Sequence, residues 1–378
     1  MKTLFDPTGD ITAFADLLTR LDQDPEVGSI VVFSCDENGF TPESCDALLQ
    51  GLSKPVMGGL YPQIIVGREH HAKGTVAIGL PAAVHYTIIK NISDPQHDLV
   101  TAVEEVLAPD GDEETTLLVL VDGFAARISG LIDALFENFG LQPNYLGGGA
   151  GSLSLKQKPC VITPEGLLED AAIIADTGLH SGIGVSHGWE VISDPIKVTA
   201  SDRNTILQLN YRPAFEVYQE VVSPRAGETV TAEDFFRIAK GFPFGLRKMG
   251  TEVVVRDPLM VGEQGSLVCV GEVPANSFVH ILRGETERLI AAAGTANELA
   301  AQALQERNGE QQGRIFIDCI SRVLFMEERF GEELAQVDDG LPMVGALTLG
   351  EIANSGQDYL EFYNKTAVVG LFDFNARD

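Results

Sequence analysis

The stretch TLLVLVDGF, at residues 116–124, decides the fold class of this chain. It is a nearly continuous apolar run, as expected of a strand in a sheet that is covered on both faces. The run ends at Asp122-Gly123, and apolar residues at helical spacing follow, at Ile128, Leu131, Ile132, Leu135 and Phe139. A buried strand, a turn and an amphipathic helix in succession predict an α/β architecture.

The same alternation extends to both sides of this unit. SIVVF at 29–33 predicts a buried strand, and a helix start with proline in its first turn follows at Thr41-Pro42-Glu43. The longest helical pattern runs from Glu285 to Glu306. The pattern changes near Asn210 without any linker. We therefore predict a mixed α/β fold of two intimately packed modules with mixed sheets, at 1–209 and 210–378.

Composition limits the classes of partner. The chain has 378 residues with 55 acidic and 26 basic side chains, a net charge of −29. Such a surface repels phosphate backbones and anionic lipid, so we expect no nucleic acid partner. No apolar run approaches the ~20 residues that span a bilayer, so we expect no membrane insertion. The first residues, MKTLFDPTGDITAF, lack the pattern of a signal peptide, and we expect a cytoplasmic protein.

The five cysteines do not form a recognisable framework. Their number is odd, their spacings are wide, and no CxxC pair occurs. This pattern argues against a set of disulfides and against a zinc ribbon. The cysteines are Cys35, Cys45, Cys160, Cys269 and Cys319.

The glycine-rich segment GGGAG, at residues 147–151, resembles a phosphate-binding loop only superficially. Counting from Gly147, the sixth position of the dinucleotide motif is Ser152 instead of glycine, and no GK[ST] occurs. We expect a flexible turn beside a ligand cavity, with Gly148 and Gly149 among the ligand contacts.

Cys319 and Arg322 stand three residues apart after the predicted strand at 315–317. If a helix begins there, the two side chains share its first turn. The simplest interpretation is a core thiol and an arginine that pairs with a carboxylate such as Glu351. A second is that Arg322 grips the carboxylate of an amino-acid-like ligand. The third belongs to another class: a cysteine-dependent enzyme in which Cys319 is the nucleophile and a histidine is the base.

Two polar residues near the end of the chain complete the candidate binding site. Glu351 follows a strand in TLGEI, where its carboxylate could receive an amino group or pair with Arg322. Asn364 interrupts the last predicted strand and is expected to cap backbone groups at a bulge. The predicted pocket therefore contains Arg322, Glu351, Asn364, Cys319 and the GGGAG segment.

None of the seven histidines lies in a metal-binding motif. His70 and His71 are adjacent and would point to opposite faces of a strand, so they could not chelate one metal. A single histidine suffices as an axial ligand of haem. His187 suits that role best, because it lies beside Gly188-Trp189 after an apolar run at 183–185. His180 and His280 follow, since each is next to a strand-like apolar segment.

Several segments, taken in order, resemble the FIST family. The FIST N module is matched by LVDGF (120–124), GGGAG (147–151), EDAAIIADTG (169–178) and GVSHGWEVIS (184–193). The FIST C module is similar to VTASDRNTILQLNYRPAFEVYQ (198–219), DCISR (318–322), PMVGALTLGEI (342–352) and YNKT (363–366). One segment departs from the family: GGLYPQIIVG (58–67) lacks the cysteine and the glutamate that the family often has there.

The resemblance implies a bacterial sensory protein that binds a small ligand, such as an amino acid, and is not an enzyme. A subset of the family resembles haem proteins that sense nitric oxide and regulate histidine kinases or cyclic-di-GMP enzymes. Haem is therefore an alternative ligand, and His187 is its candidate axial ligand. We expect the output to pass to a separate signalling protein.

Overall fold

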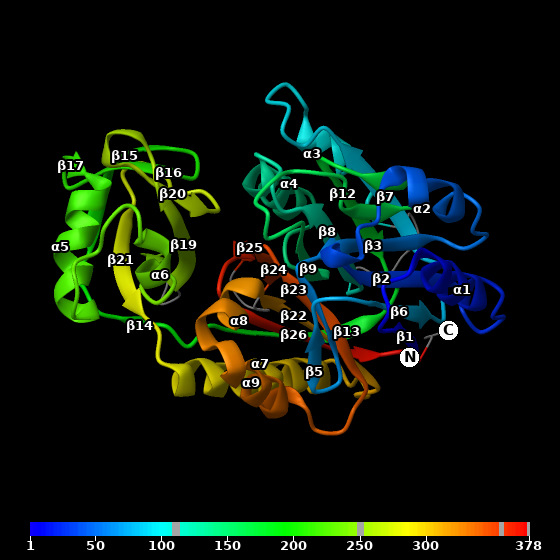
Figure 1. Ribbon diagram of the computed structural model, residues 1–378. Helices are drawn as coiled ribbons and strands as arrows, with labels where there is room; N and C mark the ends of the chain where they lie inside the picture. Colours follow the sequence, from blue (N-terminus) through cyan, green and yellow to red (C-terminus); the bar gives the residue numbers. More distant parts are fainter. Residues whose placement is uncertain (108–113, 248–252, 355–358, 376–378) are drawn as a thin grey trace.

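The apolar run at 116–124 forms strand β8 (Thr116–Asp122), which is buried along its whole length, and helix α4 (Ile128–Phe139) follows it. Strand β9 (Asn144–Ala150) then returns parallel to β8. The computed structural model, which describes residues 1–107, 114–247, 253–354 and 359–375, shows a large body and a smaller lobe beside it (Figure 1). The α/β mixed fold predicted from the sequence is confirmed.

The strand–helix–strand unit occurs two further times in the described body. One copy is β2 (Ser29–Cys35), α2 (Pro42–Leu49) and β3 (Val56–Tyr61). The other is β22 (Gly313–Cys319), α8 (Ile320–Met326), α9 (Phe330–Val337) and β23 (Met343–Thr348). In all three copies the two strands are parallel.

A glycine occupies the same position in the second strand of each copy. A Cβ at Gly58, Gly147 or Gly345 would lie 2.1, 1.8 or 1.7 Å from the carbonyl oxygen of its partner residue in the first strand. Only glycine permits that approach. In all three copies, therefore, the backbones of the two parallel strands approach closely at corresponding positions.

The sheet of each copy also contains an antiparallel strand pair. Each copy contributes a hairpin that pairs with the sheet of a neighbouring copy. The antiparallel pairs are β1 (Lys2–Asp6) with β6 (Thr75–Leu80), β7 (His85–Lys90) with β12 (Ala171–Asp176), and β13 (His180–Ser186) with β26 (Ala367–Asp373). The hairpins are β4–β5 (Gln63–Val66, Glu69–His71), β10–β11 (Val161–Thr163, Gly166–Leu168) and β24–β25 (Glu351–Asn354, Leu360–Tyr363). They pair with β23, β3 and β9 respectively, so the three sheets are joined in a ring.

The smaller lobe is a barrel inserted between β13 and helix α7 (Thr286–Glu306). Pairing of β18 (Phe244–Arg247) with β21 (Phe278–Arg283) closes its sheet. The remaining strands are β14 (Glu190–Val191), β15 (Ile196–Asp202), β16 (Thr205–Leu209), β17 (Arg212–Pro213), β19 (Val253–Val261) and β20 (Leu267–Val270), with helices α5 (Ala214–Ala226) and α6 (Phe235–Ala239). The strands on both sides of residue 210 belong to this one sheet.

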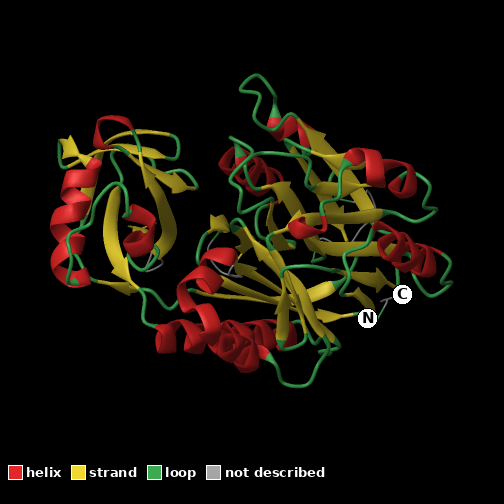
Figure 2. Cartoon of the chain, viewed as in Figure 1, coloured by secondary structure: helices red, strands yellow, loops and turns green. Residues whose placement is uncertain are grey.

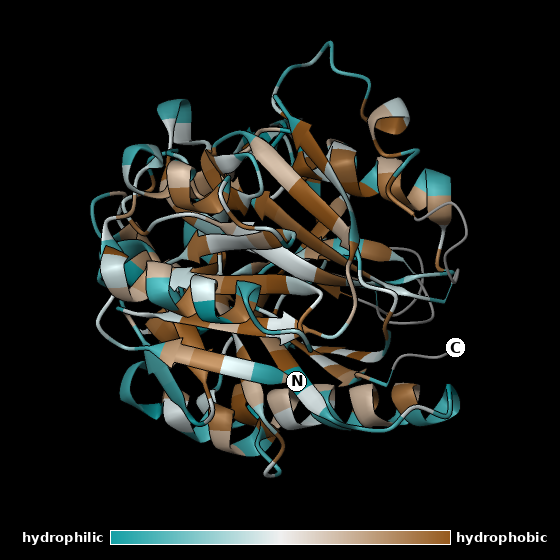
Figure 3. Ribbon diagram, turned by 90° about the vertical axis from the view of Figure 1, so that its right-hand side faces the viewer, coloured by the Kyte–Doolittle hydropathy of each residue, from teal (hydrophilic) through white to brown (hydrophobic). Residues whose placement is uncertain are grey.

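Helices cover the outer faces of the body sheets, as Figure 2 shows, and hydrophobic residues concentrate on the strands between them (Figure 3). The predicted helix at 285–306 is confirmed as α7. It packs closely on β13, because a Cβ at Gly184 would lie 1.8 Å from the carbonyl oxygen of Ala296. Shorter helices are α1 (Ile11–Asp22) and α3 (Leu99–Ala102), with 3-10 turns at Asp36–Asn38, Glu263–Gly265 and Glu327–Arg329. Among the described helices, none has the length and apolar character to span a bilayer.

The prediction of a flexible turn at 147–151 is wrong. Residues 147–150 belong to strand β9, which lies between β8 and β24. The amide of Gly149 donates to the carbonyl of Gly350 over 2.8 Å, and the amide of Leu349 donates to the carbonyl of Gly149 over 2.9 Å. These glycines allow two backbones to meet closely.

Candidate functional site

A cleft of about 780 Å³ lies between the barrel and the body. The body contributes the segment after β8, the end of β22 and the first turns of α8. The barrel contributes residues of β19, β20 and the 203–204 turn. The cleft is therefore built by segments that are remote in sequence, and it is large enough for a small organic ligand.

The walls of the cleft are mainly apolar. Three of the large apolar side chains that line it, Leu153, Leu155 and Met260, are 45–48% exposed. The other apolar side chains that line it include Phe124, Phe236, Leu259, Ile320, Leu324, Leu349 and Phe362. Such a surface favours a ligand with an apolar body.

The polar floor of the cleft centres on Asp257 from strand β19 of the barrel. Its Oδ2 accepts a hydrogen bond from the hydroxyl of Ser321 over 2.7 Å and pairs with Lys365 Nζ at 3.1 Å. Ser321 and Lys365 both belong to the body. Burial raises the pKa of Asp257, whereas Lys365 and Ser321 oppose that rise. This carboxylate therefore joins the two lobes at the base of the cleft.

Asn364 is the second polar residue of the floor, and it lies between β25 and β26 as a strand interruption, as predicted. Its side-chain amide nitrogen donates to the carbonyl of Tyr363 over 2.8 Å, and its own carbonyl accepts from the hydroxyl of Thr366 over 2.8 Å. The side chain is 1% exposed. Its Oδ1, like Oδ1 of Asp257, has no hydrogen-bond partner among the described residues.

Cys319 lines the cleft at the end of β22, and its thiol is buried. Burial raises the pKa of this thiol well above its ordinary value. Glu351 lies behind it, where its carboxylate accepts hydrogen bonds from the hydroxyl of Thr348 (3.1 Å) and the amide of Thr366 (3.2 Å). Burial raises the pKa of Glu351 to about 8. Glu351 therefore supports the floor and is not part of the cleft lining.

Arg322 is fully buried in the body, beyond the cleft lining. Its Nε and Nη2 donate to Oε1 of Glu333 over 3.0 and 2.6 Å, and Nε lies 3.2 Å from Oδ1 of Asp318. Its remaining bonds go to the carbonyls of His187 (2.8 Å), Leu289 (2.9 Å) and Lys365 (3.2 Å). All its nitrogens are thus used by protein groups. The geometry gives Arg322 a role in holding the body together.

Gly148 and Gly149 belong to β9, where Gly148 pairs with Glu351. Neither glycine lines the cleft. The structure therefore brings Cys319 and Asn364 together at the floor and places Arg322, Glu351, Gly148 and Gly149 behind it.

His187 lies at the first of two chain crossings between the lobes. Its Nδ1 accepts a hydrogen bond from the amide of Trp189 over 2.9 Å, and burial lowers its pKa to about 4. It lines neither the cleft nor the second hollow described below, and the described cleft lining contains no histidine. An axial ligand must face the slot that holds the macrocycle. The residues present therefore do not fit a haem group held by His187.

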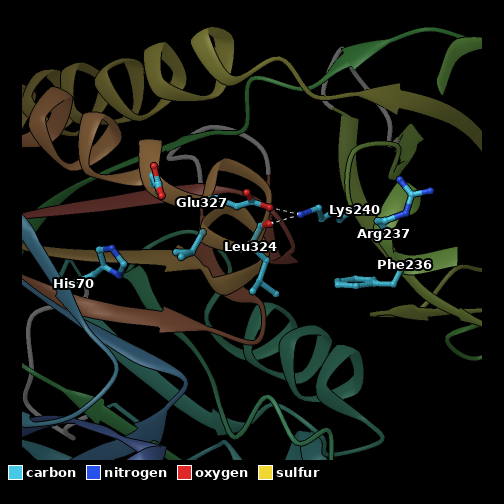
Figure 4. Close-up of a pocket in the computed structure, with 8 residues that line it drawn as sticks. His70, Phe236, Arg237, Lys240, Leu324 and Glu327 are labelled. Carbon is cyan, nitrogen blue, oxygen red and sulfur yellow. Dashed lines mark hydrogen bonds and ion pairs between the residues drawn. The ribbon is translucent and has the colours of Figure 1, made fainter. Parts of the chain in front are cut away.

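A second hollow, of about 680 Å³, lies on the same seam and shares Phe236 and Leu324 with the cleft. Figure 4 shows Lys240 of the barrel reaching across to the body. Its Nζ donates to the carbonyl of Leu324 and to Oε1 of Glu327, each over 2.8 Å. His70 faces this hollow from the body. Lys240 thus holds the seam closed at the surface.

The chain crosses between the lobes at residues 187–189 and 284–285. Trp189, the only tryptophan, belongs to the first crossing and packs against Gly284 of the second, and its ring nitrogen donates to the carbonyl of Lys365 over 3.0 Å. The ammonium of Lys365 lies 5.2 Å from the centre of the indole ring. A Cβ at Gly284 would lie 2.4 Å from that ring. The crossing segments and the cleft floor are therefore in direct contact.

Sequence reasoning missed Asp257, Ser321 and Lys365. Lys365 and Ser321 stood within the segments that resembled the family, in YNKT and DCISR. Asp257 carried a weaker signal, a charged Arg256-Asp257 pair inside an apolar strand. Charges in such a position are buried only when they are paired.

Comparison with protein families agrees with this architecture. The FIST N domain model matches residues 29–212, and the FIST C domain model matches residues 214–354. No curated protein matches the chain. FIST domains are in general sensory domains of signal transduction that bind small ligands. Since the two models together cover most of the sequence, the chain belongs to the FIST family.

Proposed function

We propose that this protein is a sensor that binds a small ligand in the cleft between barrel and body and signals through a separate protein, such as a histidine kinase or a cyclic-di-GMP enzyme. One observation carries the proposal: the carboxylate at the cleft floor, Asp257, belongs to the barrel, and both side chains that hold it belong to the body. A ligand that contacts this floor acts on both lobes at once.

We propose that the response is a movement of the barrel. The remaining contacts across the seam are both apolar, through Val254, Val255 and Leu282, and polar. Arg256 of the barrel pairs with Glu361 at 3.0 Å and donates to the carbonyl of Phe362 over 3.0 Å, and Lys240 bonds to Glu327. Interfaces between domains of one chain commonly permit relative motion. A ligand shifts the position of the barrel by as much as its affinity differs between the two arrangements.

A cysteine-dependent reaction is less well supported. A nucleophilic cysteine requires a lowered pKa and a base within hydrogen-bond reach. The pKa of Cys319 is raised, and no described histidine lines the cleft with it. We likewise propose no haem-based mechanism, because His187 does not face the cleft. An amino-acid carboxylate has no partner in Arg322, whose nitrogens are all engaged.

The five cysteines are buried and unpaired. Buried free thiols are typical of proteins from reducing compartments. We therefore propose a cytoplasmic sensor in which the modules at 1–209 and 210–378 fold as one unit.

The test compares two variants of the barrel. Val268→Phe adds a ring to the cleft wall, and Val221→Phe makes the same change at a half-buried position of α5 away from the cleft. Protein is dialysed to equilibrium against a metabolite extract, and retained compounds are identified by mass spectrometry.

We expect the wild type and Val221→Phe to enrich the same compound, and Val268→Phe to lose it. Equal enrichment by Val268→Phe would show that the ligand binds elsewhere. If no compound is enriched by the wild type, small-ligand binding in this cleft is refuted.

A further inference from the structure

Two buried oxygen atoms at the cleft floor lack a hydrogen-bond donor. Oδ1 of Asp257 and Oδ1 of Asn364 have no hydrogen-bond partner among the described residues. Both residues line the cleft, and both are 1% exposed. A buried acceptor without a partner is unfavourable, and nearly all such groups in native proteins are satisfied. The floor therefore offers two acceptors to a ligand.

Each neighbouring donor group already has a protein acceptor. The hydroxyl of Ser321 donates to Asp257. The ammonium of Lys365 pairs with Asp257 and donates to the carbonyl of Lys240 over 3.1 Å. The amide nitrogen of Asn364 donates to Tyr363. A ligand that itself only accepts hydrogen bonds would leave both orphan oxygens unsatisfied, so its polar group must donate.

The charge at the floor is already balanced. Asp257 and Lys365 form a one-to-one ion pair that is shielded from solvent. Behind the floor, Arg322 pairs with both Asp318 and Glu333. Burial raises the pKa of these two carboxyls and of Glu351, which favours their neutral forms. An ionised ligand group brought to this floor would lose its hydration without meeting an unpaired opposite charge. Two charged side chains line the barrel side of the cleft, the exposed Arg203 and the half-buried Glu272, and neither is part of this buried floor.

We propose that the polar head of the ligand is uncharged and donates hydrogen bonds to Asp257 and Asn364, with a primary carboxamide as its simplest form, and that an apolar body fills the walls. This inference rests on the proposed function, since it assigns the ligand class of the same cleft. It replaces an amino-acid-like ligand, whose ammonium and carboxylate are both charged.

Four compounds with one ring and nearly identical shapes test the assignment. Benzamide is uncharged and donates, and acetophenone has a methyl group in place of the amino group. Benzamidine carries a positive charge, and benzoate carries a negative one. Dissociation constants are measured by ligand-observed NMR at pH 7 with the full chain. We expect benzamide to bind tighter than each of the other three by at least about tenfold.

Variants of the floor and of the wall locate the effect. In Asn364→Ala the advantage of benzamide over acetophenone should fall toward one, while acetophenone binding stays unchanged. Val268→Phe should weaken all four compounds, whereas Val221→Phe should weaken none. If Asn364→Ala does not fold, Asp257→Asn gives a second measurement, because it leaves the ammonium of Lys365 unpaired and should thereby lower the penalty against benzoate and raise the penalty against benzamidine.

The assignment is overturned if benzamidine, benzoate or acetophenone binds as tightly as benzamide, or if none of the four binds. Its failure is separable from that of the proposed function. Enrichment of a charged metabolite that Val268→Phe abolishes would keep the cleft as the site and reject the uncharged head.

Discussion

Replacing Arg322 with methionine tests whether this arginine holds the body together. The substitution keeps the volume of the side chain and removes its charge. Asp318 and Glu333, both fully buried, then lose the cation at 3.2 and 2.6 Å. The carbonyls of His187, Leu289 and Lys365 lose their donors as well. Breaking a buried ion pair by removing one partner costs about 3–5 kcal/mol.

That loss is a large part of the roughly 5–15 kcal/mol by which most domains are stable. The free energy of unfolding is measured by urea titration, with Trp189 fluorescence as the signal. The matched control is Arg329→Met, a surface arginine that pairs with Glu287 and Glu332. It should unfold at the same urea concentration as the wild type, because solvent screens exposed ion pairs.

The pH dependence of the stability of Arg322→Met provides a second test. Burial raises the pKa of Asp318 and of Glu333, and Arg322 opposes that rise. A carboxyl with a raised pKa in the folded state contributes stability at low pH, and this stability is lost as the pH rises through the folded-state value. Arg322→Met should therefore be destabilised more at pH 8 than at pH 5, and adding Glu333→Gln should recover part of the loss.

Unchanged stability of Arg322→Met together with lost ligand affinity would refute this reasoning. It would return Arg322 to the role of a ligand contact. A loss of stability in Arg322→Met that grows as the pH falls would also contradict this reasoning, because buried carboxyls destabilise the folded state at high pH.

Four further outcomes follow from the structure. Cys319 should resist a thiol reagent at pH 7 and react only after denaturation, because burial raises its pKa; fast labelling of the native protein would contradict this. Since the pKa of Glu351 is raised to about 8, wild-type stability should fall as the pH passes from 7 to 9, and Glu351→Gln should reduce that slope. Gly284→Ala should shift the emission of Trp189, because a Cβ there would lie 2.4 Å from the indole ring; an unchanged spectrum would show that the crossing relaxes freely. Limited proteolysis should not release two separately folded halves near residue 210, because the strands on both sides of it share the barrel sheet.

The sequence predicted the strand at 116–122 and helix α7 well, because their apolar periodicity is long and uninterrupted. It failed at 147–150, where glycine is usually a sign of a turn. In β9 the glycines instead allow backbones to approach closely. Gly147 approaches β8, whereas Gly148 and Gly149 approach a segment some 200 residues away in the chain. No local pattern could show the exchange of hairpins between sheets for the same reason.

The candidate site was predicted only in part. Cys319 and Asn364 do lie at the cleft floor. Arg322 was placed among the ligand contacts because it follows Cys319 closely, but the start of α8 directs it into the body toward Glu333. Asp257 could not be connected with Lys365 from sequence, since more than 100 residues and the whole of α7 separate them.

The ring of exchanged hairpins has a mechanical consequence. Because every sheet of the body is completed by a strand from another unit, none can shift without breaking hydrogen bonds in its neighbours. The body is thus stiff, and the barrel joins it through two short crossings and through the ion pairs of Asp257, Arg256 and Lys240. Under the proposed function, a ligand in the cleft would shift the barrel relative to this body. A partner protein that senses occupancy would then contact the barrel, or the two lobes together.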